Sequence, residues 1–312
     1  MNNLIKITFF VFLLSCGQDI TYENNIKEDL IFLADDKLEG RKTGTEGEKL
    51  AAKYISERFE KLNLSDKGTE NYYQDFYFGN NNNPHEEIEF NKESDNSQIH
   101  ARNVVGFLDN GGSNTVVIGA HYDHLGYGEE SSLYFGDEVL IHNGADDNAS
   151  GTSLLLDLAN RLATKELKSN YLFIAFSGEE MGLLGSNYFL KNPTVSKDEI
   201  NYMINMDMVG RLNEENKLSV SGVGSAKIFK QIVNSNNSNF NLVEFGSSST
   251  SSFGSSDHAS FYYEDIPVLS FFTGQHEDYH KPSDDYDKIN FEGIELISCL
   301  LYTSDAADDR LR

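Results

Sequence analysis

The stretch TVVIGAHYDH, residues 115–124, decides the expected fold. Its first six residues are small or β-branched and almost wholly apolar, which is typical of a strand covered on both faces. Similar runs recur along the chain, separated by helical patterns at 150–165, 182–191 and 225–234; the runs span residues 103–108, 171–177, 202–209, 217–222 and 266–272. This alternation predicts an α/β fold, a three-layer sandwich around a mixed, mainly parallel sheet, in a single domain.

The charge of the chain excludes one class of partner. Its 312 residues contain 50 acidic and 25 basic side chains, a formal net charge of −25. Binding to nucleic acid phosphates requires a basic surface. We therefore expect no nucleic acid partner.

The N-terminus predicts export. Residues 1–15 contain one lysine and an apolar stretch that is too short to span a bilayer, as in a signal peptide. Leu13, Leu14, Ser15 and Cys16 resemble a bacterial lipobox, in which the cysteine is lipidated. We therefore expect a lipoprotein, membrane-anchored through Cys16, with a tether at 16–25 and a location in the bacterial cell envelope, periplasmic or at the cell surface. An ordinary signal peptide with an incidental cysteine is the alternative.

The C-terminus has a different peculiarity. Residues 299–308, CLLYTSDAAD, resemble the translation of a transposon-end adapter used in sequencing libraries. We therefore expect a native domain over 26–298 that is truncated at its C-terminus, followed by a foreign tail at 299–312. Cys299 would then not be native, and the mature domain would have no disulfide to form.

Metal-ligand residue types follow nearly every predicted strand. They are His121, Asp123 and His124, then Asp146 and Asp147, Glu179 and Glu180, Asp207, and finally His276 and His280. Ligand sites in α/β folds lie outside the carboxyl ends of the strands, where crowded carboxylates need a positive partner. Histidine with several carboxylates suits zinc, with manganese or cobalt as alternatives, and the number of carboxylates suits two ions. One carboxylate would remain as a general base.

Five segments in this order resemble the co-catalytic two-zinc aminopeptidases, the group that includes the glutamate carboxypeptidases, glutaminyl cyclases and the transferrin receptor ectodomain. The segments are GAHYDHLG, HNGADDNASGT, AFSGEEMGLLGS, INMDMVGR and DYHKPSDDYDKI. The resemblance extends from about Leu33, in LADDKLEGRKTGTEG, to Phe291. It implies a zinc-peptidase-like fold with two Zn²⁺ ions.

The resemblance implies a role for each matching position. His121, Asp146 and Asp207 would hold one ion, and Asp146, Glu180 and His280 the other, so that Asp146 is the bridging ligand. Asp123 would orient the His121 imidazole, and Glu179 would be the general base. It also implies a cis peptide between Asp146 and Asp147. The remaining histidines match no ligand position: His124 and His142 are expected in loops or at the substrate, His258 in a supporting role, and His276 exposed.

The implied activity is that of a metal-dependent exopeptidase, most simply an aminopeptidase that removes N-terminal residues from peptides. A carboxypeptidase or dipeptidase would share every ligand. Glutaminyl cyclase fits less well, because that branch keeps a single zinc and departs from GADDNASG. A lipid-anchored binding protein without catalysis is the alternative from another class. The sequence leaves the oligomeric state open.

Overall fold

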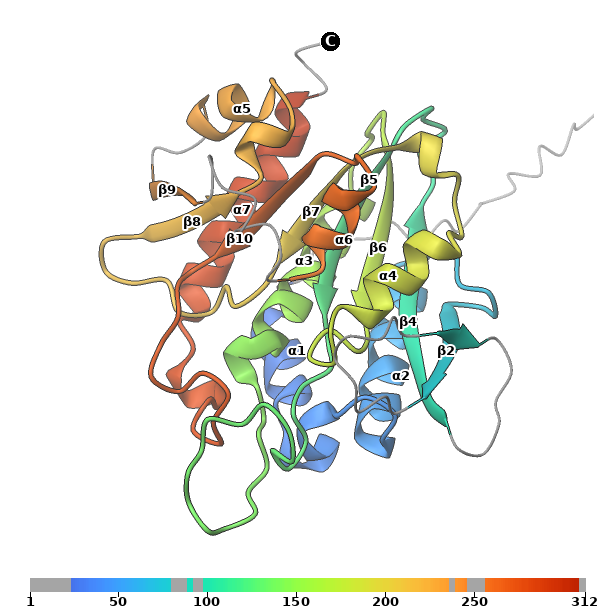
Figure 1. Ribbon diagram of the computed structural model, residues 1–312. Helices are drawn as coiled ribbons and strands as arrows, with labels where there is room; N and C mark the ends of the chain where they lie inside the picture. Colours follow the sequence, from blue (N-terminus) through green and yellow to red (C-terminus); the bar gives the residue numbers. More distant parts are fainter. Residues whose placement is uncertain (1–23, 80–88, 92–97, 236–238, 246–255, 309–312) are drawn as a thin grey trace, which may run out of the picture.

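The computed structural model describes residues 24–79, 89–91, 98–235, 239–245 and 256–308. The predicted signal peptide and Cys16 lie outside the described residues. Within them, ten strands form one sheet, and helices cover both of its faces (Figure 1). The predicted three-layer α/β/α architecture in a single domain is confirmed.

The sheet is parallel in its centre, antiparallel pairs flank this centre on both sides, and the pair β8–β9 at one edge is again parallel. Its order is β3-β2-β4-β6-β5-β7-β10-β8-β9, and β1 pairs with β4 off this path. The central strands β6, β5, β7 and β10 run parallel, whereas β4 and β8 pair antiparallel to their central neighbours. The bounds are β1 Ser65–Asp66, β2 Tyr73–Gly79, β3 Phe90–Asn91, β4 Gln98–Leu108, β5 Thr115–His121, β6 Asn170–Phe176, β7 Ile200–Met206, β8 Lys217–Ser221, β9 Asn241–Phe245 and β10 Val268–Phe272.

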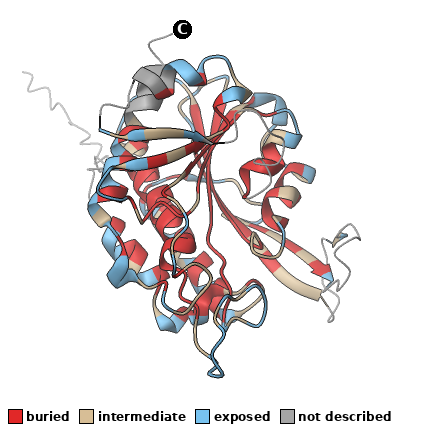
Figure 2. Ribbon diagram, turned by 60° about the vertical axis from the view of Figure 1, so that its left-hand side comes forward, coloured by how far each residue is buried: buried red, intermediate tan, exposed pale blue. Residues whose placement is uncertain are grey.

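Two groups of helices form the outer layers. Residues of the first group share one apolar core with the sheet: α1 Ile26–Leu33, α2 Glu46–Lys61, α3 Gly151–Ala163, α5 Phe229–Ser235 and α7 Phe291–Asp308. Two helices, α4 Leu184–Lys191 and α6 His258–Tyr263, contribute to a second core on the opposite face (Figure 1). Every residue of β5 and β6 is buried, because helices cover both sides of the sheet (Figure 2).

Local sequence signals account for the start of α2. The Thr45 hydroxyl accepts a hydrogen bond from the Glu48 backbone N–H at 3.4 Å, and the Glu48 carboxylate accepts one from the Gly44 N–H at 2.6 Å. The first bond satisfies a donor that the helix leaves free at its first turn, and the second holds the residue that precedes the N-cap Thr45. No helix among the described residues combines the length and apolar character needed to cross a membrane.

The end of the chain continues α7 to Asp308. Leu300 and Leu301, which follow the proposed junction at Cys299, are buried in the larger core. The foreign origin of residues 299–312 stays a prediction.

Candidate metal centre

The carboxyl ends of the central parallel strands gather the predicted residues at one edge of the sheet. His121 is the last residue of β5, and Asp207 follows the last residue of β7. Glu179 and Glu180 follow β6, while His280 lies in the connection between β10 and α7. Parallel strands end on the same side of a sheet, so segments far apart in sequence meet here.

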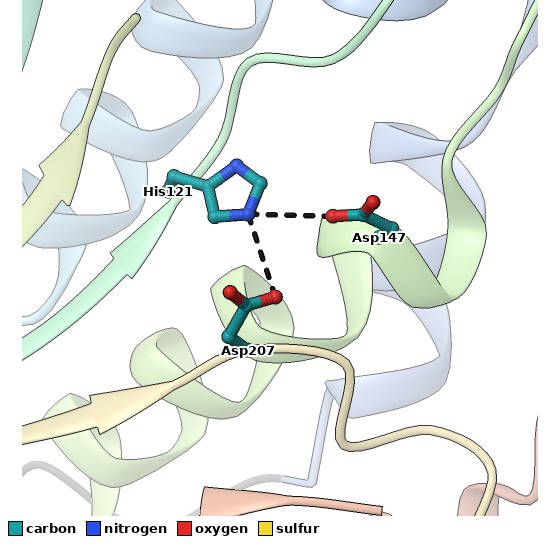
Figure 3. A group of neighbouring side chains, drawn as sticks. All are labelled: His121, Asp147 and Asp207. Carbon is teal, nitrogen blue, oxygen red and sulfur yellow. Dashed lines mark ion pairs between the residues drawn. The ribbon is translucent and has the colours of Figure 1, made fainter. Parts of the chain in front are cut away.

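The first group of ligand atoms surrounds the His121 imidazole. Its Nε2 lies 3.3 Å from Asp147 Oδ1 and 3.5 Å from Asp207 Oδ1 (Figure 3). The His121 side chain is 1% exposed. The three side chains come from β5, from the turn before α3 and from the end of β7, and all point toward one another (Figure 3).

The second group shares Asp147 with the first. The other Asp147 oxygen, Oδ2, lies 3.2 Å from His280 Nε2, which is 3.3 Å from Glu180 Oε2. Asp147 therefore presents one oxygen to each histidine. We call His121, Asp147, Glu180, Asp207 and His280 the ligand cluster.

The position expected for Asp146 is occupied by Asp147, so the assignment of Asp146 as the bridging residue is wrong in this geometry. Asp146 Oδ1 accepts a hydrogen bond from the Gly210 N–H at 2.6 Å, and Oδ2 lies 3.1 Å from His276 Nε2. The cis peptide is likewise one residue later than expected, between Asp147 and Asn148. The two aspartates point in different directions, and their local sequence, between small residues, does not reveal which one faces the cavity.

Glu179 lies beside the ligand cluster rather than within it. Its Oε2 is 4.0 Å from His121 Nε2, longer than the distances inside the cluster. Burial raises the pKa of Glu179 well above its usual range; His121 opposes this, and Asp207 and Glu180 add to it. A carboxyl group with a raised pKa at the edge of a cavity is suited to accept and return a proton.

Asp123 supports both sides of the centre. Its Oδ1 is 3.7 Å from His121 Nδ1, and its backbone oxygen is closer to that nitrogen, at 3.3 Å. Its carboxylate accepts hydrogen bonds from the backbone N–H groups of Glu179 at 3.1 Å and Glu180 at 3.4 Å. Asp123 thus fixes the Glu179–Glu180 turn in addition to its predicted contact with His121.

Two of the other histidines lie nearer the centre than expected. His124 Nδ1 is 2.8 Å from Glu180 Oε1, and the ligand atoms of His124, Asp147 and Glu180 all lie within 4.8 Å of one another. His276 is not exposed: its side chain is 14% exposed and contacts Asp146. His142 lies in a loop, as expected, and contacts Ser132 Oγ at 2.7 Å.

The histidines of the cluster offset its negative charge. Burial by itself would lower the pKa of His121, but Glu179 and Asp207 outweigh it and hold the pKa well above the usual value. Burial likewise opposes the shift at His280, where hydrogen bonds with Asp147 and Glu180 raise the pKa to about 10. A divalent cation bound here would compete with protons for the nitrogen atoms of these histidines.

Sequence reasoning missed two residues that hold the loop carrying Asp147. The buried Arg41 guanidinium donates hydrogen bonds to the backbone oxygens of Tyr122 at 2.8 Å, Asn143 at 2.6 Å and Gly144 at 3.0 Å, and also to that of Leu33. It thereby ties the end of β5 to the turn before α3. Arg41 lies in LEGR, part of the segment that resembles the family, and this membership was the one sequence feature that could have indicated its role.

Asp284 holds the same turn from the other side. Its Oδ2 accepts the backbone N–H groups of Asp146 at 2.9 Å and Asp147 at 3.0 Å, while Oδ1 accepts from Arg211 at 3.1 Å. Asp284 is fully buried, and the acidic run SDDYD gave no indication of which carboxylate turns inward. We call Arg41, Asp123, Asp146 and Asp284 the support network.

A cavity of about 230 Å³ opens onto the ligand cluster. Its volume exceeds that of a single water molecule severalfold, so it has room for part of a larger substrate. Beyond the cluster and Glu179, its lining consists of Met208, Ser219, Ser221, Ser256, His258, Ser270, Phe272, Gln275 and Tyr279.

The fold of this chain resembles that of solved zinc exopeptidases and related enzymes. A Zn-dependent exopeptidase from Parabacteroides distasonis superposes with a TM-score of 0.70 and 18% identity, over 92% of this chain and 98% of that one. Porphyromonas gingivalis glutaminyl cyclase gives a TM-score of 0.71 and 16% identity, over 93% and 99%. At these identities the likeness concerns the fold.

The sequence profile of Peptidase family M28 matches residues 103–303, and the chain belongs to this family. Aminopeptidase YwaD of Bacillus subtilis is 32% identical over 180 residues, which is 53% of this chain and 39% of that protein. The chain therefore spans well under half of this relative's length. The predicted resemblance to the co-catalytic zinc peptidase group is confirmed.

Proposed function

We propose that the protein is a zinc-dependent aminopeptidase that hydrolyses N-terminal residues from peptides, with two ions in the ligand cluster. One observation carries the proposal: Asp147 presents its two oxygens to two different histidines, at 3.3 Å from His121 and 3.2 Å from His280. A carboxylate that bridges two ions presents one oxygen to the ligands of each ion, as Asp147 does here. Membership of Peptidase family M28 and the similarity to an aminopeptidase support the reaction class.

The donor set fits zinc. Tetrahedral zinc with nitrogen and oxygen ligands at about 2.0–2.1 Å places neighbouring ligand atoms about 3.3 Å apart. The distances within the cluster are 3.2–3.5 Å. His121, Asp147 and Asp207 would hold one ion, and Asp147, Glu180 and His280 the other.

The second ion has two candidate histidines. We assign His280 as its ligand because His280 Nε2 contacts both Asp147 and Glu180 at tetrahedral spacing. His124 forms a shorter contact of 2.8 Å with Glu180 alone, which suits a hydrogen bond that orients this carboxylate.

The chemistry then divides among the residues. Two bound zinc ions would polarise the scissile carbonyl and lower the pKa of water at the site. Glu179 accepts the proton from the attacking water and returns it to the leaving amine. Asp123 holds the Glu179 backbone, and Arg41 and Asp284 hold Asp147 in position.

The test is a panel of aminoacyl anilides, N-acetylated anilides and peptides with a blocked C-terminus, assayed with and without chelator. We expect cleavage of free N-termini only, abolished by chelator and restored by zinc, with two zinc ions per chain. Cleavage that requires a free C-terminus would instead indicate a carboxypeptidase, and activity restricted to dipeptides a dipeptidase. Zinc binding without any turnover would indicate a binding protein.

A glutaminyl substrate separates hydrolysis from cyclisation. Hydrolysis releases free glutamine, whereas cyclisation releases ammonia and leaves the peptide bond intact. Mass spectrometry of the products distinguishes the two, and ammonia release would overturn the proposal in favour of a cyclase.

We further propose that a lipid on Cys16 anchors the protein in the bacterial envelope. The lipobox-like residues Leu13 to Cys16 support this. The Cys16→Ser variant, expressed in a bacterium, should move from the membrane fraction to the soluble fraction. Unchanged membrane association would contradict the proposal.

A further inference from the structure

The strands β8 and β10 contribute four residues to the lining of the cavity. These strands pair antiparallel, with Ser270 opposite Ser221 and Phe272 opposite Ser219. Residues two apart on a strand face the same side of the sheet. The four side chains thus share one face, and all of them line the cavity.

The other face of the same strand pair has the opposite character. Leu218 and Val220 of β8, with Leu269 and Phe271 of β10, are buried in the apolar core. The strand pair is therefore apolar on the face that packs against the core and rich in hydroxyl groups on the face that lines the cavity. Since Ser270 is only 4% exposed, the cavity places a hydroxyl where a covered sheet usually has an apolar side chain.

His258, at the start of α6, lines the same cavity as these strand residues. It is 2% exposed, yet neither Nδ1 nor Nε2 has a hydrogen-bond partner in the described structure. A buried imidazole without partners is costly, because its polar atoms have lost water without a replacement. We call Ser219, Ser221, Ser270 and His258 the polar wall.

The charge state of the polar wall restricts what it can bind. Burial lowers the pKa of His258 to about 4, so the ring is neutral at neutral pH and offers one donor and one acceptor. Among the described residues that line the cavity there is no lysine or arginine. The wall therefore has hydrogen-bonding capacity without a charge to pair with an acidic side chain.

We propose that the polar wall selects substrates whose N-terminal residue has an uncharged hydrogen-bonding side chain, a carboxamide or a hydroxyl, and that His258 is the principal specificity-determining residue. The inference rests on the proposed function. A carboxamide offers donors and an acceptor, as do the neutral imidazole and the hydroxyls. An apolar side chain of the same size would leave the buried His258 and Ser270 groups unpaired, which is how enzymes reject analogues that lack a polar group.

The experiment compares near-isosteric pairs of aminoacyl anilides with the zinc-loaded protein: glutamine with methionine, asparagine with leucine, and threonine with valine. We expect kcat/KM to favour the polar member of each pair by about 10-fold or more, the cost of leaving a buried polar group unpaired. Equal or higher kcat/KM for the apolar members would overturn the inference.

Three variants locate the preference. His258→Leu should reduce the glutamine-to-methionine ratio to near 1, and Ser270→Ala should reduce it about 3-fold. His100→Leu is the matched control, because His100 lies on β4 and contacts Asp75 outside the cavity; its ratio should equal that of the wild type. An unchanged ratio in Ser270→Ala, which removes only one hydroxyl, would overturn the inference even if His258→Leu failed to fold.

An alanyl anilide separates this inference from the proposed function. If the alanyl substrate is cleaved in a chelator-sensitive manner but polar side chains are not preferred, only the proposed role of the polar wall in specificity is overturned. Failure to cleave any substrate in the presence of zinc, the alanyl anilide included, overturns the proposed aminopeptidase activity.

Discussion

The ligand cluster and the support network both contain buried aspartates, but the partners of these carboxylates differ. In the support network, the carboxylates of Asp123, Asp146 and Asp284 accept hydrogen bonds from backbone N–H groups or from Arg211. In the ligand cluster, the carboxylate of Asp147 contacts two histidines and, among the described residues, no backbone donor. The network is satisfied by the protein itself, whereas the cluster has its oxygen and nitrogen ligands turned toward one another, as a cation requires.

The sharpest test of this difference uses the adjacent aspartates. Asp147→Asn removes the charge shared by both ions, and we expect zinc affinity to fall by more than about 100-fold, beyond the usual effect of residues that only support a ligand. Asp146→Asn should lower it about 10-fold. Competition with a chromophoric chelator measures both. Equal losses in the two variants would contradict the distinction.

Glu179 should affect turnover without affecting metal binding. We expect Glu179→Gln to bind two zinc ions and to lose about 10³-fold in kcat, because the amide cannot accept the proton of water. Glu129→Gln is the control, since Glu129 pairs with Lys42 in a loop outside the cavity lining. A Glu179→Gln variant with more than a tenth of the wild-type kcat would remove Glu179 from the role of general base.

The support network should affect stability even without metal. Arg41→Met leaves several backbone oxygens without a donor, and we expect unfolding of the metal-free protein to require about 3 kcal/mol less free energy. The control is Arg102→Met, which removes a partly exposed ion pair with Asp75. Losing this pair should lower the free energy of unfolding by about 1 kcal/mol or less. Urea titrations followed by circular dichroism measure both. Similar losses of unfolding free energy in the two variants would show that Arg41 stabilises the protein no more than a partly exposed ion pair does.

The smallest effect concerns pH. In the metal-free protein the pKa of His280 is about 10, above the unfolded value near 6.5, so its contribution to stability is complete below pH 6.5 and lost as the pH rises toward 10. The Tm of the metal-free protein should therefore decline over this interval. Zinc displaces these protons, so the Tm of the zinc-loaded protein should decline less. Parallel Tm curves for the two forms would argue against protonated histidines in the cluster.

Much of the fold could be predicted because its signals are local. The apolar runs correspond to strands, and the helix predicted at 150–165 is α3 Gly151–Ala163. His121, Glu179, Glu180 and Asp207 follow predicted parallel strands, so their proximity in space could also be predicted. The edge strands and their directions were less predictable, because strand pairing depends on contacts between distant segments.

The choice between Asp146 and Asp147 could not be made from local sequence. Both stand between small residues in GADDNASG, and either could begin a helix or bind a metal. The direction of each side chain depends on Asp284, which accepts the backbone N–H groups of both aspartates and lies 138 and 137 residues further along the chain. Gly210 and His276 then take the Asp146 carboxylate, and Asp147 remains facing the cavity.

The sequence by itself determined the α/β class, the family and the chemical types at the strand ends, because these depend on short patterns and on residue identity. The tertiary structure decided which of two adjacent carboxylates faces the two histidines. It also decided that Arg41 and Asp284 support them and that three serines and His258 face the same cavity. Those facts depend on the pairing of β8 with β10 and on buried contacts between distant segments, which only the assembled sheet brings together.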